Sequence, residues 1–237
     1  MGMGRAAAVR FATEGARVGL LDLNEEAASA VADEVASAGG EALVLVADVR
    51  VEEQVAAAVD TAVDAWGGLD IVVANAGVEL AGQDDRADRL SLDVWQRTID
   101  VNLTGVFLTC KHGIRALLAS GGGSVVCTAS PTGLYGCAPG YDAYSASKAG
   151  VYGLIRVMAA DYASEGIRVN GVIPGYTKTP MTEWVSEEQE TALLRTIPLG
   201  RAGRPEEVAE VMLVLASDET PYVTGAVWAA DGGMTAI

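Results

Sequence analysis

Lysine and histidine are scarce in this 237-residue sequence, which has one histidine and 32 acidic residues against 16 Lys and Arg. Its only lysines are Lys111, Lys148 and Lys178. The formal net charge of -16 leaves no excess of positive charge to neutralise phosphates. This balance argues against a nucleic-acid partner, because binding a phosphate backbone requires clustered Lys and Arg.

Cysteine is also rare. Cys110, Cys127 and Cys137 have neither the even number nor the spacing of a disulfide framework or a zinc site, so we expect reduced thiols and no metal. The single His112 has no partner motif, which favours a structural role. The sequence contains no apolar run of about 18 residues and no basic leader, so we expect a cytoplasmic protein that does not bind membranes.

Apolar runs alternate with helical segments along the whole chain, in which half of the residues are hydrophobic. The expected strands are residues 17–22, 42–47, 69–74, 124–129, 167–173 and 226–230. The expected helices are 6–12, 25–37, 52–66, 93–118, one that starts at Tyr144 and one that starts at Pro205. Continuous apolar strands between helices indicate a parallel sheet covered on both faces. We therefore predict one domain, residues 1–237, with a doubly wound, Rossmann-like α/β fold.

The opening of the chain departs from this pattern. Gly2-Met3-Gly4 forms a glycine turn that leads directly into the first expected helix. A βαβ unit has a strand before such a turn, and the sequence leaves no room for one. We therefore expect the first strand and the start of the glycine motif to be missing. That strand would be central, so its two neighbours would each keep an unpaired edge.

Polar residues follow three of the expected strands. Asp22, Asp48 and Asn75-Ala76-Gly77 stand where ligands bind in such folds, beyond the carboxyl ends of the strands. The Gly2/Gly4 turn at a helix N-terminus suits a pyrophosphate. Asp22 lies about 20 residues further on, where a dinucleotide fold places its acceptor for the ribose 2′-hydroxyl. Its negative charge would repel a 2′-phosphate, so we predict NAD and regard NADP as the weaker alternative.

Tyr144 and Lys148 are four residues apart at the start of an expected helix, so they share one face. A phenol has a pKa near ~10 and does little acid/base work at neutral pH. A fixed positive charge beside it would lower that pKa and make it a usable proton donor or acceptor. Ser130 ends the fourth strand and can converge on the same crevice. Asn102 is either a hydrogen-bonded residue within its helix or part of a polar site.

Together these residues resemble the short-chain dehydrogenase/reductase family over essentially the whole chain. The motifs that carry the resemblance are Gly2-Met3-Gly4, Asp48-Val49, Asn75-Ala76-Gly77, Asn102, Ser130, Tyr144-x-x-x-Lys148, Pro174-Gly175 with Thr177, and Asp231-Gly232-Gly233. The spacing from Ser130 to Tyr144 is about one residue longer than this family leads us to expect.

The resemblance implies a role for each of these residues. Tyr144 would be the general acid or base, and Ser130 would bind the substrate oxygen. Lys148 would bind the nicotinamide ribose and lower the pKa of Tyr144, while Asn102 would hold a water on the proton path. Asp48 would contact adenine and Asn75 would support the central sheet. The expected cofactor-binding set is Gly2, Met3, Gly4, Asp22, Leu23, Asp48, Val49, Asn75, Ala76, Gly77, Tyr144, Lys148, Pro174, Gly175 and Thr177.

We therefore predict an NAD(H)-dependent oxidoreductase that transfers hydride between nicotinamide and a secondary alcohol or ketone. One alternative is an NADPH-dependent 3-oxoacyl-type reductase. NADP-preferring members of the family often carry a basic residue just before Gly2, in a place that Met1 occupies or conceals, whereas Asp22, followed by Leu23 and Asn24 without an arginine, argues for NAD. The other is a truncated, inactive nucleotide-binding relative. We expect residues 176–200 to form a lid over the substrate. The apolar helical segments 101–118 and 151–162 are either buried within the domain or part of a homo-oligomeric interface, and the resemblance implies a homodimer or homotetramer through them.

Overall fold

A computed structural model describes residues 2–236, so Met1 lies outside the described residues. Strands and helices alternate along these residues, and every pair of neighbouring strands is parallel. The strands are β1 Arg17–Asp22, β2 Glu41–Val46, β3 Ile71–Ala74, β4 Gly123–Thr128, β5 Ile167–Pro174 and β6 Val227–Ala230. The helices are α1 Gly2–Thr13, α2 Glu25–Ser37, α3 Glu52–Trp66, α4 Leu92–Ile99, α5 Gly105–Ser120, α6 Asp142–Tyr162, α7 Glu187–Leu194 and α8 Pro205–Ala216. This order confirms the predicted Rossmann-like α/β fold.

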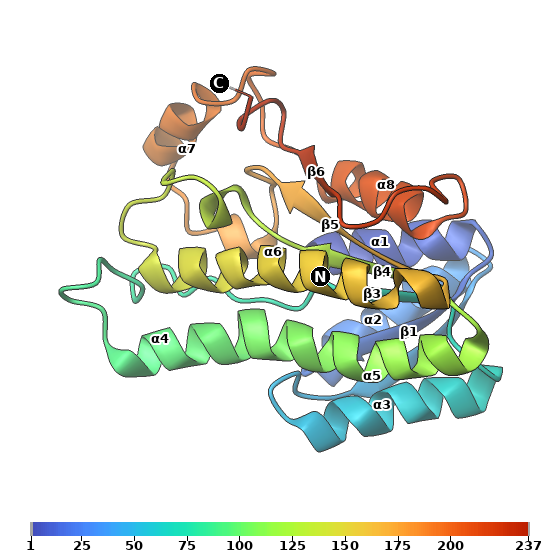
Figure 1. The fold of residues 1–237 in the computed structure, drawn as a ribbon. Helices are drawn as coiled ribbons and strands as arrows, with labels where there is room; N and C mark the ends of the chain where they lie inside the picture. The colour runs from blue at the N-terminus through green and yellow to red at the C-terminus, as the bar shows by residue number, and fades with distance from the viewer. Residues whose placement is uncertain (1, 237) are drawn as a thin grey trace.

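The helices form a layer on each face of the strands (Figure 1). Along β4, Val125 and Cys127 pack into one core cluster with α5 and α6, whereas Val126 packs into a second cluster with α1 and α8. Successive side chains of a strand point to opposite faces, so both faces of β4 are buried. This double burial explains why the strand reads as a continuous apolar run.

The strands are divided between two sheets. β1 pairs only with β2, while the second sheet has the order β3-β4-β5-β6. Within residues 2–236, β1 and β3 therefore each keep one edge without a strand partner. Val18 of β1 and Ile71 and Val73 of β3 pack against the same core cluster beneath α1. The open edges of β1 and β3 thus belong to strands that pack under the same helix.

The expected helix over residues 93–118 is interrupted. It consists of α4, a π-helical turn from Asp100 to Thr104, and α5, which follow one another as one long rod (Figure 1). In the π turn the amide of Gly105 donates to the carbonyl of Asp100, five residues back. Such single turns are frequent at functional sites. Asn102 lies inside this turn.

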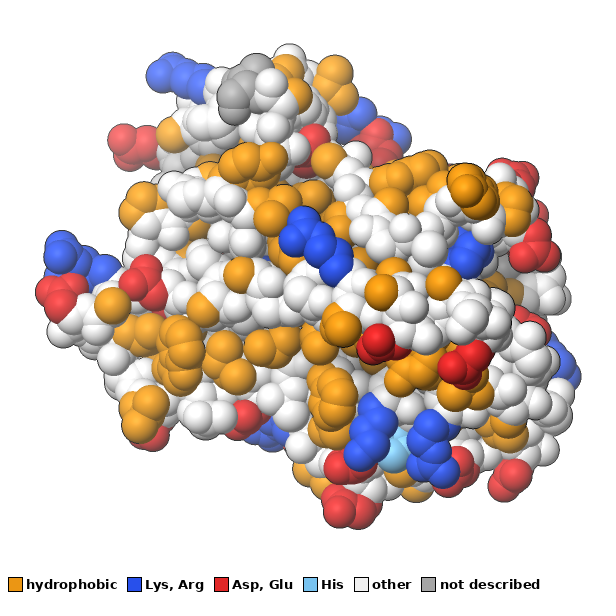
Figure 2. All heavy atoms as spheres, viewed as in Figure 1, with side chains coloured by type: hydrophobic (Ala, Val, Ile, Leu, Met, Phe, Trp, Pro, Cys, Tyr) orange, Lys and Arg blue, Asp and Glu red, His pale blue; other side chains and the backbone are white. Residues whose placement is uncertain are grey.

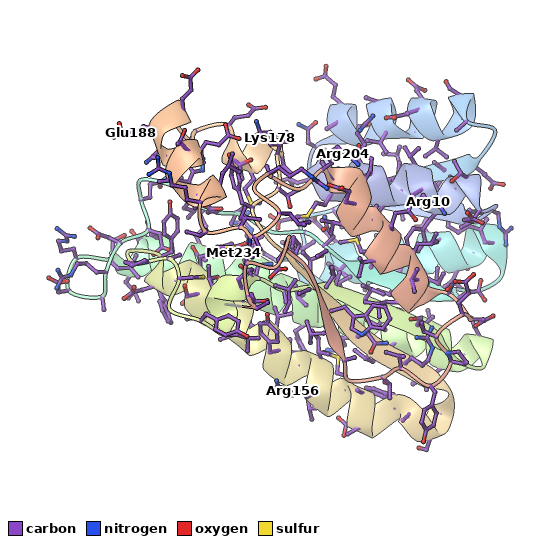
Figure 3. All side chains as sticks on the ribbon, turned by 90° about the horizontal axis from the view of Figure 1, so that it is seen from above. Arg10, Arg156, Lys178, Glu188, Arg204 and Met234 are labelled. Atoms are coloured by element: carbon purple, nitrogen blue, oxygen red, sulfur yellow. The ribbon has the colours of Figure 1, made fainter. Side chains whose placement is uncertain are left out.

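The expected lid, residues 176–200, contains a short 3₁₀ turn, Pro180–Thr182, and helix α7. Its Trp184 ring stacks on Tyr141 with the ring centroids 6.4 Å apart. Figure 3 shows α7, which carries the labelled Glu188, standing away from the sheet. No helix among residues 2–236 is long and apolar enough to cross a membrane.

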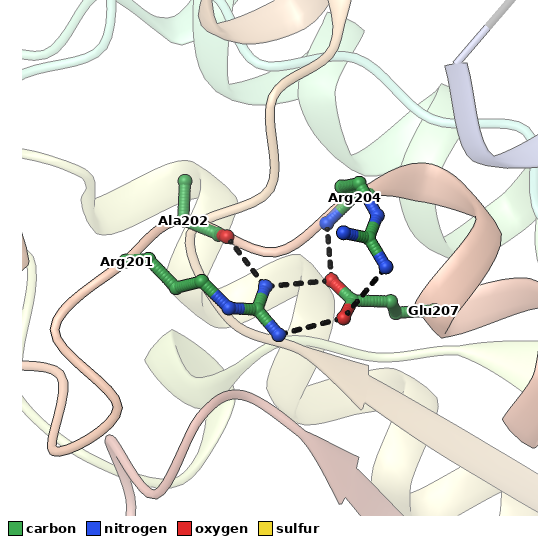
Figure 4. A network of polar contacts seen from close by, with 4 residues as sticks. All are labelled: Arg201, Ala202, Arg204 and Glu207. Carbon is green, nitrogen blue, oxygen red and sulfur yellow. Dashed lines mark hydrogen bonds and ion pairs between the residues drawn. The ribbon is translucent and has the colours of Figure 1, made fainter.

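Just beyond the lid, the chain is anchored to the start of α8 (Figure 4). Arg201 donates two hydrogen bonds, of 2.8 and 2.7 Å, to the Glu207 carboxylate, and the backbone amide of Arg204 donates a third of 2.9 Å. The hydrogen bond from Arg201 is the largest cause that lowers the pKa of Glu207, to about 2. This bidentate contact fixes the chain at the C-terminal end of the lid to α8.

Candidate active site

The carboxyl ends of β1, β3, β4 and β5 carry most of the predicted site residues, in agreement with the general rule for open α/β sheets. Gly2 and Gly4 lie in the first turn of α1 and not in a separate loop before it. A Cβ atom at Gly4 would come 2.9 Å from the Asn75 amide nitrogen, and one at Gly2 would lie 3.4 Å from Cβ of Thr179. The glycine turn therefore meets the end of β3 and the start of the lid.

Tyr144, Lys148 and Ser130 come together as the sequence predicts. Tyr144 and Lys148 lie on α6, and the Lys148 ammonium is 5.7 Å from the centre of the Tyr144 ring. Ser130 follows β4, and its hydroxyl lowers the pKa of the Tyr144 phenol. The Ser130 and Thr132 hydroxyls are 3.0 Å apart. The hydroxyl groups of Ser130 and Tyr144 are thus brought to one place beside the buried Lys148 ammonium. Hydrogen-bond donors arranged in this way stabilise the negative charge that develops on a substrate oxygen.

The pKa of Tyr144 differs from our expectation. Burial raises the pKa of this phenol, the charge of Glu79 raises it further, and the hydrogen bond from Ser130 only partly offsets these effects. Burial also lowers the pKa of Lys148, to about 8, because an ammonium loses its hydration there. We expected Lys148 to lower the pKa of the phenol. In this structure burial and Glu79 raise that pKa instead, and Lys148 is not among the groups that shift it.

Asn102 holds the loop after β3. Its side-chain oxygen accepts a 2.8 Å hydrogen bond from the amide of Val78, and its amide donates to the carbonyl of Val78 at 2.9 Å and to Ser147 at 3.2 Å. We considered that Asn102 is either hydrogen-bonded within its helix or part of a polar site. It is buried and hydrogen-bonded, and one of its partners, Ser147, precedes Lys148 on α6. Asn102 is the one buried residue of the π turn, and through it the turn contacts the loop after β3.

Asn75 links three elements. Its side-chain oxygen accepts a 3.0 Å hydrogen bond from Thr128 at the end of β4, and its nitrogen faces Gly4 of α1. These contacts fit the expected support of the sheet. Asp48, in contrast, forms a 2.6 Å ion pair with its neighbour Arg50, and the hydrogen bond from that arginine lowers the pKa of Asp48. Val49 packs against Gly105 at the start of α5.

The remaining cofactor-binding residues that we expected lie at the carboxyl ends of β5, next to the lid, and of β1. Pro174 ends β5, Gly175 approaches Asp231 so closely that a Cβ atom would come 2.7 Å from its Cα, and Thr177 is buried with its hydroxyl 3.0 Å from the Gly175 carbonyl. Asp22 ends β1 with its carboxylate accepting the Asn24 amide, and Leu23 is exposed.

The donors and acceptors present fit a dinucleotide. Buried Lys148 donates one hydrogen bond, of 2.9 Å, to the carbonyl of Thr128, which leaves two N–H donors without an acceptor among residues 2–236. Ribose hydroxyls are suitable acceptors for such donors. A Cβ atom at Gly77 would lie 3.7 Å from the Lys148 nitrogen, so the bare backbone there keeps the space beside the ammonium open. At the other end, the exposed Asp22 carboxylate is available to a ribose diol.

Three residues around this site were not predicted from the sequence. Tyr152 is buried on α6 and donates a 2.9 Å hydrogen bond to the carbonyl of Ser130. Asp84 caps the start of α6 by accepting the amides of Ala143 and Tyr144. Glu79 influences Tyr144 electrostatically. Only the spacing of Tyr152 two turns after Tyr144, on the same helical face, was a signal that sequence reasoning could have used.

The remaining titratable groups lie apart from this chemistry. Cys110 and Cys127 are buried with their sulfurs 3.8 Å apart, and Cys137 is exposed. His112 contacts Glu52 at 3.1 Å. Among residues 2–236 no group of three or more His, Cys, Asp or Glu side chains could hold a metal ion.

Comparison with known proteins agrees with this geometry. The family model described as enoyl-(acyl carrier protein) reductase matches residues 1–235; because the match starts at residue 1, it does not itself show that a strand is missing. Cyclohexanol dehydrogenase of Acinetobacter sp. (strain SE19) is 41% identical over 234 residues, which cover 99% of this chain and 91% of that protein.

Two solved structures share the fold. A short-chain type dehydrogenase/reductase from Mycobacterium marinum has a TM-score of 0.94 and 38% identity, and the match covers 100% of this chain and 92% of that one. Carveol dehydrogenase from Mycobacterium avium, solved in complex with NAD, has a TM-score of 0.94 and 33% identity, with 100% and 95% covered. The chain therefore belongs to the short-chain dehydrogenase/reductase family.

Proposed function

We propose that Tyr144 is the proton donor and acceptor of an NAD(H)-dependent oxidoreductase that interconverts a secondary alcohol and a ketone. The observation that carries the proposal is the position of the half-buried Tyr144 on α6: the Lys148 ammonium lies 5.7 Å from its ring centre, and Tyr152 of the same helix binds the carbonyl of Ser130. The enzyme acts on CH–OH groups. Bound NAD supplies the hydride acceptor, and NADH the hydride donor.

The chain's own residues carry the proton chemistry. In alcohol oxidation, Tyr144 accepts the hydroxyl proton of the substrate while Ser130 donates a hydrogen bond to the same oxygen. In ketone reduction, the phenol returns the proton. Lys148 stabilises negative charge on the phenol and presents its free N–H groups to the nicotinamide ribose. Asn102 keeps Val78, and with it the rim of the site, fixed during both directions.

Asp22 supports the choice of NAD. It ends β1 as an exposed carboxylate, followed by Leu23 and Asn24, with no arginine in these positions to pair with a 2′-phosphate. A carboxylate accepts hydrogen bonds from ribose hydroxyls and repels a phosphate. This feature also argues against the NADPH-dependent 3-oxoacyl-type reductase that we considered.

A fluorescence titration with NADH and, separately, with NADPH tests the cofactor, and NAD-dependent oxidation of cyclohexanol tests the reaction. We expect saturable NADH binding, weaker NADPH binding and measurable turnover. Cyclohexanol is a suitable first probe because a similar protein carries its name and because Tyr144 and Ser130 require only one oxygen to act on. Tight binding of NADPH alone would contradict the assignment.

The divided sheet supports a further part of the proposal. β1 and β3 each have one unpaired edge under the common cover of α1, a gap that suits one more parallel strand. We infer that such a strand belongs there and that residues 2–236 do not supply it. If so, extending the chain upstream should strengthen NADH binding and raise the melting temperature. An extended chain that binds NADH no better would favour the divided sheet as the working form, and no binding by either version would favour the inactive relative.

An oligomer is the expected assembly. Hydrophobic side chains gather over α5 and α6 (Figure 2), and a 440 Å³ depression there is lined by Leu103, Thr104, Phe107, Gly150, Gly153 and Leu154. Phe107 is 45% exposed and Val157 is 51% exposed. We expect a homodimer or homotetramer by sedimentation, and Phe107→Glu should shift it to the monomer. A wild-type monomer would contradict this part.

The expected cytoplasmic location stays a prediction.

A further inference from the structure

The loop after β3 carries a carboxylate into the rim of the catalytic crevice. Val78 is held by both polar ends of Asn102, at 2.8 and 2.9 Å. Further along the loop, the carbonyl of Leu80 accepts the amide of Asp84 at 2.9 Å, and Asp84 accepts the Tyr144 amide at 2.9 Å. The segment between these two anchors therefore runs from beside Asn102 to the start of α6. Glu79 is its one charged residue.

Glu79 has no partner for its charge. The side chain is half-buried, and it forms no ion pair or hydrogen bond with any residue between 2 and 236. Three neighbouring carboxylates, in contrast, are occupied: Asp84 by backbone amides, Asp142 by the Ala87 amide, and Asp231 by Gly233 and Thr235. With no donor among these residues, the Glu79 carboxylate takes its hydrogen bonds from water or from a bound molecule.

We propose that Glu79 is a substrate-selecting residue that accepts a hydrogen bond from a second hydroxyl group of the substrate, so that the enzyme prefers diols to simple alcohols and rejects hydroxy acids. This inference rests on the proposed function, because it places the second hydroxyl relative to the one that meets Tyr144 and Ser130. A carboxylate accepts hydrogen bonds but cannot donate them when ionised, and it repels another carboxylate.

The electrostatics agree with a carboxylate that faces the crevice. The charge of Glu79 raises the pKa values of both Tyr144 and Tyr141. Burial raises the pKa of Glu79 itself, and the neighbouring Asp84 adds to this effect. Tyr141 in turn stacks on Trp184 of the lid, so the charge of Glu79 acts on both the catalytic phenol and the residue that contacts the lid. The second hydroxyl would therefore enter on the lid side of the reacting oxygen.

The test compares kcat/KM for three substrates of the same ring size: cyclohexanol, 1,4-cyclohexanediol and 4-hydroxycyclohexanecarboxylate. Each is measured with the wild type, Glu79→Gln and Glu79→Leu. The matched control is Asp88→Asn, which removes an exposed carboxylate of the same loop. Ratios between substrates are used because any effect of Glu79 on Tyr144 is common to all three and cancels. NADH binding and the melting temperature establish that each variant is folded.

The wild type should favour the diol over cyclohexanol by about 10-fold or more and disfavour the hydroxy acid by a similar factor, the scale of a hydrogen bond to a charged group. Glu79→Leu should remove both differences, Glu79→Gln should reduce them, and Asp88→Asn should leave them in place. Equal ratios in the wild type and Glu79→Leu, with cyclohexanol still oxidised, would overturn this inference alone. If NADH binds but no ring alcohol is oxidised, the proposed function fails and this inference fails with it.

Discussion

The phenol of Tyr152 donates a 2.9 Å hydrogen bond to the backbone carbonyl of Ser130. Gly133 follows in the same loop, and a Cβ atom there would come 2.7 Å from the backbone of α6 and 2.9 Å from the Tyr152 ring. The loop after β4 is therefore docked closely onto α6. This contact sets the position of Ser130 relative to Tyr144.

Tyr152→Phe tests this positioning role. We expect kcat to fall about 10-fold, because small displacements of catalytic groups are costly, while the Kd for NADH is unchanged. The hydrogen bond from Ser130 lowers the pKa of Tyr144, so a displaced Ser130 should move the pH-rate profile for oxidation to higher pH. Tyr162→Phe, on the same helix, is the control. A fall in stability with an unmoved profile would indicate that Tyr152 serves packing only.

The pH dependence of Glu79→Gln gives a second prediction. Its pH-rate profile should move in the opposite direction to the profile of Tyr152→Phe. Alcohol oxidation requires the deprotonated phenol, so its rate rises with pH through the pKa of Tyr144. The negative charge of Glu79 raises that pKa because it disfavours the phenolate. In Glu79→Gln the rising limb of kcat for cyclohexanol oxidation should therefore move to lower pH. A limb that stays in place would show that Glu79 does not act on Tyr144.

Much of the site followed from the sequence because its residues are set by local spacing. Tyr144 and Lys148 share a helical face, and Ser130 ends a strand whose apolar run is continuous, so their convergence needed no tertiary information. The shifted pKa of Tyr144 could not be predicted in the same way. It depends on the burial of the phenol and on the charge of Glu79, which lies 65 positions earlier in the chain.

Other features depended on long-range packing. The π turn around Asn102 keeps the helical periodicity of residues 93–118, so the sequence predicts one unbroken helix there. Asp84 caps α6 from 60 residues away, and no local pattern indicates it. Tyr152 lies in an apolar segment where an aromatic residue normally indicates a core position. Asp48 was assigned to adenine by resemblance, although Arg50, two residues on, was visible as a competing partner.

Asp22→Ala tests the choice of cofactor. Removing this exposed carboxylate takes away an acceptor for the ribose hydroxyls and a charge that repels a 2′-phosphate. We expect the ratio of Kd values for NADPH and NADH to narrow by about 10-fold, the scale of one hydrogen bond to a charged group. Asp33→Asn, an acidic residue on α2, provides a control for charge alone. An unchanged ratio would mean that the 2′-hydroxyl is bound elsewhere.

The most direct test of the account is the turnover of Tyr144→Phe with NAD and cyclohexanol, measured beside its affinity for NADH. Tyr141→Phe, three residues earlier, serves as the matched loss of a phenol. Proton transfer by a positioned side chain contributes about 10²-fold or more, so we predict at least that loss in kcat for Tyr144→Phe with an unchanged Kd for NADH. Turnover within a few-fold of the wild type would remove Tyr144 from the mechanism.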